Sequence, residues 1–285
     1  MFYSSKYLQV DENDITKRLV KINSVGLQDI TTLQAMKIIL GSIDLTTLEG
    51  SDTNERVIEL CRKAKTFSNQ GENIPNVAAV CVYPSFVKLA KSELLSTGIH
   101  VASVAGAFPA GQSPLHIKIA EINYAIEEGA DEIDMVISRG KFLEGEYNLV
   151  FDEIAAIREV CKDVHLKVIL ETGELGNYTN IALASAIAMD AGADFIKTST
   201  GKMKPAATPQ AVLVMADAIK EYYEKTGKMV GIKAAGGISE PDDALIYLMI
   251  VKDILGESWL NNALFRFGAS RLSDKVLAKI IALSH

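Results

Sequence analysis

Short, β-branched apolar segments alternate regularly along this chain with longer segments of helical periodicity. Eight strand candidates occur in order, at residues 41–45, 77–82, 100–105, 132–137, 166–170, 195–198, 230–234 and 265–268. Helix candidates of about 12–18 residues separate them. Strands that alternate with helices are parallel, and eight of them can close into a (β/α)8 TIM barrel of about 250 residues.

The competing architecture is an open, doubly wound sheet of the same strands. Two late strand ends are rich in glycine, at 235–237 and 268–270, and they favour the barrel, because barrels often bind phosphate at the loops after strands seven and eight. We therefore expect one α/β domain, a single TIM barrel over residues 41–285. Residues 1–40 are expected to form an N-terminal helical extension that packs on the outside of the barrel or closes its bottom.

The clearest helix pattern covers residues 114–128. Four apolar residues recur there at helical spacing, namely Leu115, Ile119, Ile122 and Ile126. We expect these side chains to form the face that packs against the barrel. Ser113 followed by Pro114 predicts an N-cap with proline at the first helical position.

Composition excludes several classes of function. The formal net charge is −7, whereas a surface that binds nucleic acid usually carries a basic excess, so nucleic acid is not an expected partner. No apolar run reaches the length of a membrane span and the start lacks a signal-peptide core, so we expect no membrane partner and a cytoplasmic protein. The three cysteines and four histidines show no metal-ligand spacing, so no metal site is expected.

Three strand candidates carry a charged residue between apolar neighbours: Lys197, Lys233 and Asp134. If the apolar neighbours meet the helix layer, the charged side chains point into the barrel. Neighbouring strands lie about 4.8 Å apart, so Lys197 and Lys233 can approach each other, with Asp134 as a counter-charge. A nearby cation lowers the pKa of a lysine and supplies the free amine that attacks a carbonyl, so the pair predicts imine chemistry.

Simpler interpretations exist for each lysine alone. A single strand lysine more often reaches solvent at the strand end or makes a structural ion pair with Asp134. Two inward lysines on neighbouring strands, each followed closely by a glycine-containing loop, favour catalysis instead. Because a carboxylate stabilises an ammonium group, we expect Asp134 to pair mainly with Lys233 and to leave Lys197 free to lose its proton.

Three other polar residues lie where they could face a substrate. Lys167 shares a strand face with Glu171, so it could line the barrel and pair with Asp134, and a structural ion pair explains it as well as a catalytic role does. Asp44 and Thr46 end the first strand candidate. They could hold a substrate hydroxyl or cap the following turn.

An anion site is predicted from three loops that follow the last three strands. They are Ser199-Thr200-Gly201-Lys202, Ala235-Gly236-Gly237 and Gly268-Ala269-Ser270. Glycine lets the backbone approach an anion closely, and Ser270 could open the last helix, whose N-terminal amides favour negative charge. Lys202 could add a cation, although a loop lysine is more often solvated. Arg271 could make a bidentate phosphate contact or point outward from the helix.

These residues fall in sequence blocks that resemble the deoxyribose-phosphate aldolase family, in particular its longer eukaryotic-type members. The most specific blocks are FIKTSTGK at 195–202 and GIKAAGGI at 231–238, and further matches are VASVAGAFPAG at 101–111, DEIDMV at 131–136 and ETGEL at 171–175. The resemblance implies that Lys197 forms the Schiff base, that Lys233 tunes it and that Asp134 relays a proton. Two departures are Ala234 in place of a common proline and Arg271 in place of a small residue.

The resemblance also implies the substrate and the rest of the site. The small-molecule partner would be a phosphosugar, 2-deoxy-D-ribose 5-phosphate, cleaved reversibly to D-glyceraldehyde 3-phosphate and acetaldehyde without a cofactor. Sugar-lining positions match Asp44, Thr46 and Thr200, and phosphate-binding positions match Gly201, Lys202, Gly236, Gly237 and Ser270. The alternatives are another Schiff-base aldolase and a phosphosugar sensor that lacks catalysis. The sequence leaves open whether the chain forms a homodimer.

Overall fold

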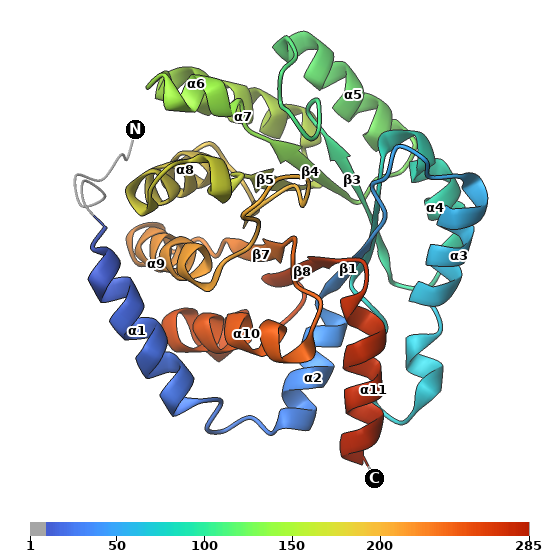
Figure 1. Ribbon diagram of the computed structural model, residues 1–285. Coiled ribbons are helices and arrows are strands. Elements are labelled where there is room, and N and C mark those ends of the chain that lie inside the picture. The colour runs from blue at the N-terminus through green and yellow to red at the C-terminus, as the bar shows by residue number, and fades with distance from the viewer. Residues whose placement is uncertain (1–9, 285) are drawn as a thin grey trace.

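The computed structural model describes residues 10–284, and its eight parallel strands form a closed barrel in chain order, with β8 paired to β1 (Figure 1). The strands are β1 (Ile43–Thr46), β2 (Ala79–Val82), β3 (His100–Ala105), β4 (Glu132–Val136), β5 (His165–Ile169), β6 (Phe195–Lys197), β7 (Gly231–Ala235) and β8 (Phe265–Ala269). Every strand lies within two residues of its predicted bounds. The prediction of a TIM barrel is therefore confirmed, and the alternative of an open, doubly wound sheet is excluded.

The helices surround the barrel. Those after the strands are α3 (Asn54–Ala64), α4 (Val87–Glu93), α5 (Leu115–Glu127), α6 (Arg139–Leu143), α7 (Tyr147–Cys161), α8 (Tyr178–Asp190), α9 (Pro209–Thr226), α10 (Pro241–Leu255) and α11 (Leu272–Ser284). Short 3-10 turns lie at Phe67–Gln70, Pro84–Phe86, Thr172–Glu174 and Glu257–Trp259. Within the described part of the chain, no helix is long and apolar enough to cross a membrane.

Alternation along the strands divides the barrel into two environments. The fully buried side chains of Ile133, Met135, Ile196 and Ile232 belong to the apolar core between the barrel and the helices. Their charged neighbours on the same strands therefore point to the barrel axis, as the period of two requires. The predicted inward direction of the strand lysines is confirmed.

The prediction for α5 is wrong in two details. Pro114 is itself the N-cap residue, with φ −55° and ψ 145° and no side-chain cap, and the helix begins at Leu115. Three residues of the predicted apolar face do pack against the core, Ile119, Ile122 and Ile126, but Leu115 is exposed, and Lys118 and Ala125 are buried as well. The helix can turn Lys118 inward because the ammonium group finds partners there: Glu153 Oε2 of α7 lies 2.9 Å from Nζ.

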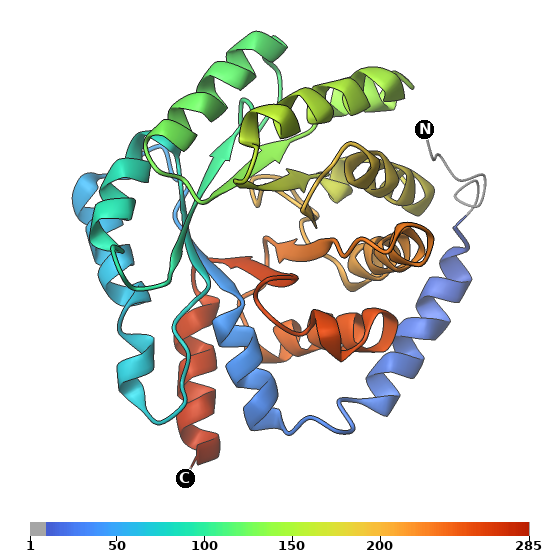
Figure 2. The ribbon, with the colours of Figure 1, turned by 180° about the vertical axis from the view of Figure 1, so that it is seen from behind.

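Two helices precede the barrel, α1 (Glu12–Val25) and α2 (Thr32–Gly41). Thr31 is the N-cap residue of α2 and forms a capping box: its side chain accepts from the backbone N of Gln34, and its backbone N donates to the Gln34 side chain. Helix α1 lies outside α9 and α10, where Arg18 makes two 2.7 Å bonds to the carboxylate of Asp217 on α9, and α2 lies beside α11 (Figures 1 and 2). The first nine residues of the predicted extension lie outside the described residues.

Candidate active site

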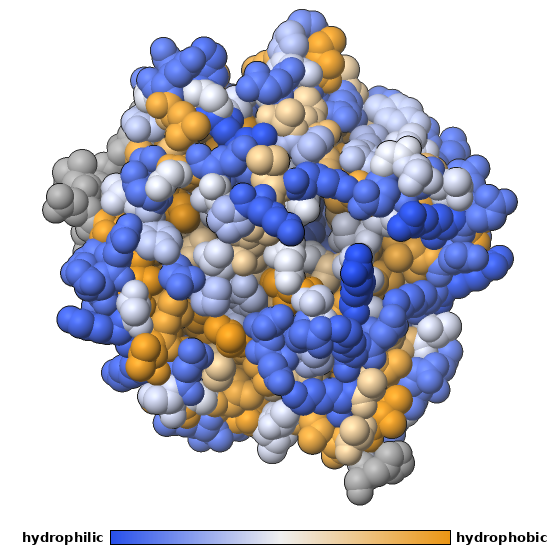
Figure 3. Space-filling model, viewed as in Figure 1, coloured by the Kyte–Doolittle hydropathy of each residue, from blue (hydrophilic) through white to orange (hydrophobic). Residues whose placement is uncertain are grey.

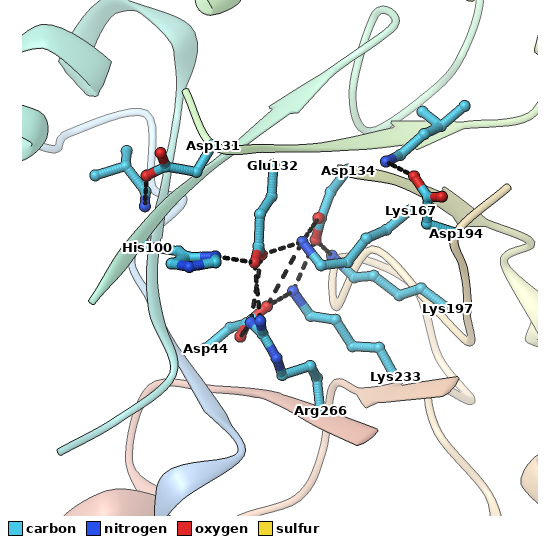
Figure 4. Close-up of polar contacts among 12 residues, drawn as sticks. Asp44, His100, Asp131, Glu132, Asp134, Lys167, Asp194, Lys197, Lys233 and Arg266 are labelled. Carbon is cyan, nitrogen blue, oxygen red and sulfur yellow. Dashed lines mark hydrogen bonds and ion pairs between the residues drawn. The ribbon is translucent and has the colours of Figure 1, made fainter. Parts of the chain in front are cut away.

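Three lysine side chains converge on one carboxylate inside the barrel, that of Asp134 on β4 (Figure 4). Lys197 Nζ of β6 and Lys233 Nζ of β7 each lie 2.7 Å from Asp134 Oδ2, and Lys167 Nζ of β5 lies 2.8 Å from Oδ1. The register of the sheet creates this cluster, because it sets Lys197 directly opposite Lys233 and Asp134 opposite Lys167. The prediction that Asp134 pairs mainly with Lys233 is wrong, because Lys197 bonds the same oxygen at the same distance.

A second set of charges lies beside this cluster. Arg266 of β8 bonds Asp44 Oδ1 at 2.6 Å and Glu132 Oε1 at 2.8 Å, and the other oxygen of Asp44 bonds Lys233. Glu132 Oε2 in turn lies 2.5 Å from Lys167 Nζ. Arg266 and Glu132 are not among the predicted site residues, although both alternate with buried apolar residues on their strands, as Lys197 does.

These charges do not balance when every group is ionised. The cluster contains three carboxylates (Asp44, Glu132 and Asp134) and four cations (Lys167, Lys197, Lys233 and Arg266), and none of their side chains is more than 4% exposed. A buried charge without a partner is costly, so the loss of one proton from a lysine is favoured. Neutralising a single lysine brings the cluster to zero net charge.

Of the three lysines, Lys197 is the one whose pKa is lowered, so it loses a proton most readily. Burial lowers its pKa below the ordinary lysine value; Asp134 opposes the shift and the ammonium group of Lys233 adds to it. Burial acts on Lys233 in the same direction, but Asp134 and Asp44 together raise its pKa above the ordinary value. Burial alone would raise the pKa of Asp134, yet its three lysine neighbours hold that pKa well below the usual range. The lysine that gives up its proton more easily therefore lies beside one that keeps its proton.

A histidine connects this network to the opposite end of the barrel. His100 begins β3, its side chain is 45% exposed, and Nδ1 lies 2.7 Å from Glu132 Oε1. The bond to Glu132 raises the pKa of His100, against the effect of partial burial. His100 has no metal-ligand spacing in the sequence, and its contact is to a residue 32 positions away, which no local pattern reveals.

A pocket of about 770 Å³ opens at the carboxyl ends of the strands, and Lys197 is the one lysine of the cluster that lines it. Lys233 and Lys167 are fully buried below it. Hydrophilic residues cover much of the face that Figure 1 views, including the middle of the barrel (Figure 3). The amine with the lowered pKa is therefore also the amine that a substrate can reach.

All six predicted phosphate-binding residues line this same pocket: Gly201, Lys202, Gly236, Gly237, Ser270 and Arg271. The loops meet closely. A Cβ on Gly236, whose φ is +85°, would lie 2.7 Å from Ala206 Cβ and 3.0 Å from Gly201 Cα. Lys202 Nζ lies 3.0 Å from Glu49 Oε1 across the mouth. The prediction that Ser270 opens the last helix is wrong by two residues, because α11 begins at Leu272.

The predicted sugar-site residues divide between the pocket and the buried cluster. Thr46 and Thr200 line the pocket. Asp44 lies below it, fully buried, with its carboxylate held by Lys233 and Arg266. Lys167 is likewise buried, and it bonds both Glu132 and Asp134. This is the ion pair with Asp134 that the sequence allowed beside a catalytic role. Among residues 10–284, no group of three His, Cys, Asp or Glu side chains could hold a metal ion.

Comparison with known proteins agrees with this geometry. Residues 38–255 match the DeoC/LacD family of aldolases. The chain is 47% identical to the deoxyribose-phosphate aldolase of Homo sapiens over 84% of this chain and 78% of that one, and 48% identical to that of Bos taurus over 81% and 76%. The solved deoxyribose phosphate aldolase of Aeropyrum pernix superposes with a TM-score of 0.69 at 26% identity, covering 96% of this chain and 100% of the other. The chain belongs to the DeoC/LacD family of aldolases.

Proposed function

We propose that this protein is a deoxyribose-phosphate aldolase that cleaves 2-deoxy-D-ribose 5-phosphate reversibly through a Schiff base on Lys197. The observation that carries the proposal is the position of Lys197. Its amine has a lowered pKa, lies 2.7 Å from Asp134 and lines a pocket that three glycine-containing loops also line. The relatives with 47–48% identity support the choice of substrate by their names.

The reaction uses the free amine as a nucleophile. Lys197 Nζ attacks the aldehyde carbon of the open-chain sugar, and water leaves as the C=N bond forms. When the C2–C3 bond breaks, its electron pair moves toward the iminium nitrogen, and the C3 hydroxyl loses its proton and becomes the aldehyde of glyceraldehyde 3-phosphate. The remaining enamine is protonated at C2, and hydrolysis of the imine releases acetaldehyde. The imine is the electron sink, so the proposed mechanism needs no cofactor or metal.

The neighbouring groups would support these steps. Lys233 remains an ammonium group, so it can stabilise negative charge near the imine, and Asp134 is positioned to relay a proton through water. Thr46 and Thr200 would contact the sugar, and the glycine-containing loops with Lys202 and Ser270 would receive the phosphate. We propose a cytoplasmic location and leave a homodimer open, since the Aeropyrum pernix relative is described as a tetramer.

Borohydride trapping tests the proposal directly. Reduction in the presence of deoxyribose 5-phosphate should inactivate the enzyme irreversibly and add the substrate fragment to Lys197, as mapped by mass spectrometry. An adduct on Lys233 or Lys167 would refute the assignment. EDTA should leave the turnover of deoxyribose 5-phosphate unchanged. Activity that EDTA removes and zinc restores would indicate a metal-dependent aldolase, and binding without turnover would indicate a sensor.

A further inference from the structure

Arg139, the first residue of α6, connects three of the loops at the carboxyl ends of the strands. Nη1 donates to Pro109 O at 3.1 Å and Nη2 to Ala110 O at 3.2 Å, both in the loop after β3. Nη1 also lies 3.2 Å from Glu171 Oε2 and Nε lies 2.8 Å from Glu174 Oε2, both in the loop after β5. Only 13% of the Arg139 side chain is exposed, so its guanidinium group is held in one place.

Glu171 continues these contacts into the loop after β6. Its carboxylate is fully buried and accepts from the backbone N of Thr200 at 3.2 Å and from Thr200 Oγ1 at 2.5 Å. Thr200 Oγ1 in turn accepts from the backbone N of Lys202 at 3.1 Å. Glu171 has φ 54° and ψ 60°, a conformation that a residue with a side chain keeps only where its surroundings determine it strongly.

The loop that this chain of contacts reaches carries two parts of the proposed site. Lys197 ends β6, and Thr200, Gly201 and Lys202 follow it on the wall of the same pocket. The conformation of this loop therefore sets the distance from the Schiff-base nitrogen to the bound phosphate. Neither Arg139 nor Glu171 is among the residues that line the pocket, so both act on it through Thr200.

We propose that Arg139 and Glu171 are positioning residues for phosphate recognition, an inference that rests on the proposed aldolase function. Glu171 fixes the Thr200–Lys202 loop by hydrogen bonds. Arg139 neutralises the Glu171 carboxylate, which would otherwise place a negative charge directly behind a loop that must receive a phosphate. The pair would thus select phosphorylated over unphosphorylated substrates without touching either.

Two substrates separate this role from a general effect on folding. Arg139→Met keeps the length of the side chain but leaves the Glu171 carboxylate unpaired. We expect its KM for deoxyribose 5-phosphate to rise about tenfold or more, since bonds to charged groups are the strong ones. Its KM for unphosphorylated 2-deoxyribose should rise several-fold less, because that substrate meets the altered loop only through Thr200 and has no phosphate to be repelled by the unpaired Glu171 carboxylate.

The second variant, Glu171→Gln, tests the charge separately. Glutamine keeps the shape and one carbonyl acceptor for Thr200, so the rise in KM for the phosphorylated substrate should be smaller than for Arg139→Met. Combining the two substitutions removes both charges, and the double variant should bind deoxyribose 5-phosphate more tightly than Arg139→Met alone. Glu171→Gln also carries the test if Arg139→Met fails to fold.

Arg158 offers a matched control on the opposite end of the barrel. Its guanidinium group also ties a carboxylate and loop carbonyls together, with Asp194 Oδ2 at 2.5 Å and Val164 O at 2.7 Å, but these residues precede β6 and β5. Arg158→Met should lower the melting temperature and leave the ratio of the two KM values as in the wild type.

Three results would overturn the inference: equal changes in KM for both substrates in Arg139→Met, the same ratio in Arg139→Met and Arg158→Met, or a double variant weaker than Arg139→Met. Inhibition by inorganic phosphate gives a second readout. In Arg139→Met the inhibition constant of phosphate should rise by about the same factor as the KM for deoxyribose 5-phosphate. Failure of the aldolase function itself is distinguishable, since the wild-type protein would then show no turnover and no borohydride adduct on Lys197.

Discussion

Replacing Lys233 with leucine tests why Lys197 loses its proton. Both amines lie 2.7 Å from Asp134 Oδ2, so they are separated by no more than twice that distance. Two unit charges about 5 Å apart in an effective dielectric of about 20 repel by roughly 3 kcal/mol, which corresponds to about two units of pKa. Without Lys233 the buried cluster holds three cations and three carboxylates, and it balances only when Lys197 stays charged.

The pH dependence of kcat/KM for deoxyribose 5-phosphate measures this effect. In Lys233→Leu the acidic limb of the profile should move about two units to higher pH, since that limb follows the pKa of Lys197. The free amine at neutral pH should fall about 100-fold, and activity should recover in part under alkaline conditions. Borohydride trapping on Lys197 should slow in the same proportion at pH 7 and recover at alkaline pH.

The control is a lysine that is equally buried but lies away from Asp134. Lys118 is fully buried and bonds Glu153 between α5 and α7. Losing one partner of such a pair costs about 3–5 kcal/mol, so Lys118→Met and Lys233→Leu should both lower the melting temperature. Only Lys233→Leu should move the acidic limb. If Lys233→Leu kept its rate at neutral pH and its pH profile of kcat/KM, the paired-lysine argument would be refuted. If Lys118→Met moved the acidic limb of that profile as far as Lys233→Leu does, lost stability would be the cause.

Three further predictions follow from the same structure. Arg271→Ser should raise KM for deoxyribose 5-phosphate and spare unphosphorylated deoxyribose, whereas equal effects on both would exclude a phosphate contact. The pKa of Glu132 is lowered, so its ionised form stabilises the fold above the ordinary carboxyl pKa of about 4, and this stabilisation is lost as the pH falls further. The pKa of His100 is raised, so its charged form stabilises the fold below about pH 6.5, and this stabilisation is lost as the pH rises. Plots of melting temperature against pH that neither Glu132→Gln nor His100→Gln changes in these ranges would contradict both statements. Gly231→Ala should destabilise the protein by about 1–3 kcal/mol in urea unfolding, because its Cβ would lie 2.3 Å from the ring of Phe195; a neutral effect would show that the ring can move.

The barrel and its central lysines were predictable because strand periodicity is short and unambiguous. A charged residue between two apolar neighbours on a buried parallel strand has only one direction in which to point, so Lys197, Lys233 and Asp134 could be placed from the sequence. The same rule applies to Arg266 between Phe265 and Phe267, which is buried at 3% exposure and could have been found in the same way.

Contacts between loops could not be predicted. Arg139 meets Pro109 and Glu171, each about 30 residues away, only because the barrel closes and brings these loops together. The left-handed conformation of Glu171 has no sequence signature, since it is not a glycine. The burial of Lys118 on α5 could not be predicted for a related reason: its partner Glu153 lies on another helix.

The ionic interior of this barrel has a consequence for heat tolerance. Most barrels fill the corresponding space with branched aliphatic side chains, and replacing a buried ion network by apolar residues is often neutral or stabilising. Here such a replacement at Arg266 or Glu132 would alter the charge balance that favours loss of the proton from Lys197. A lineage adapting to higher temperature could therefore not repack the centre of its barrel freely. We expect its stabilising substitutions to gather instead in the outer helices.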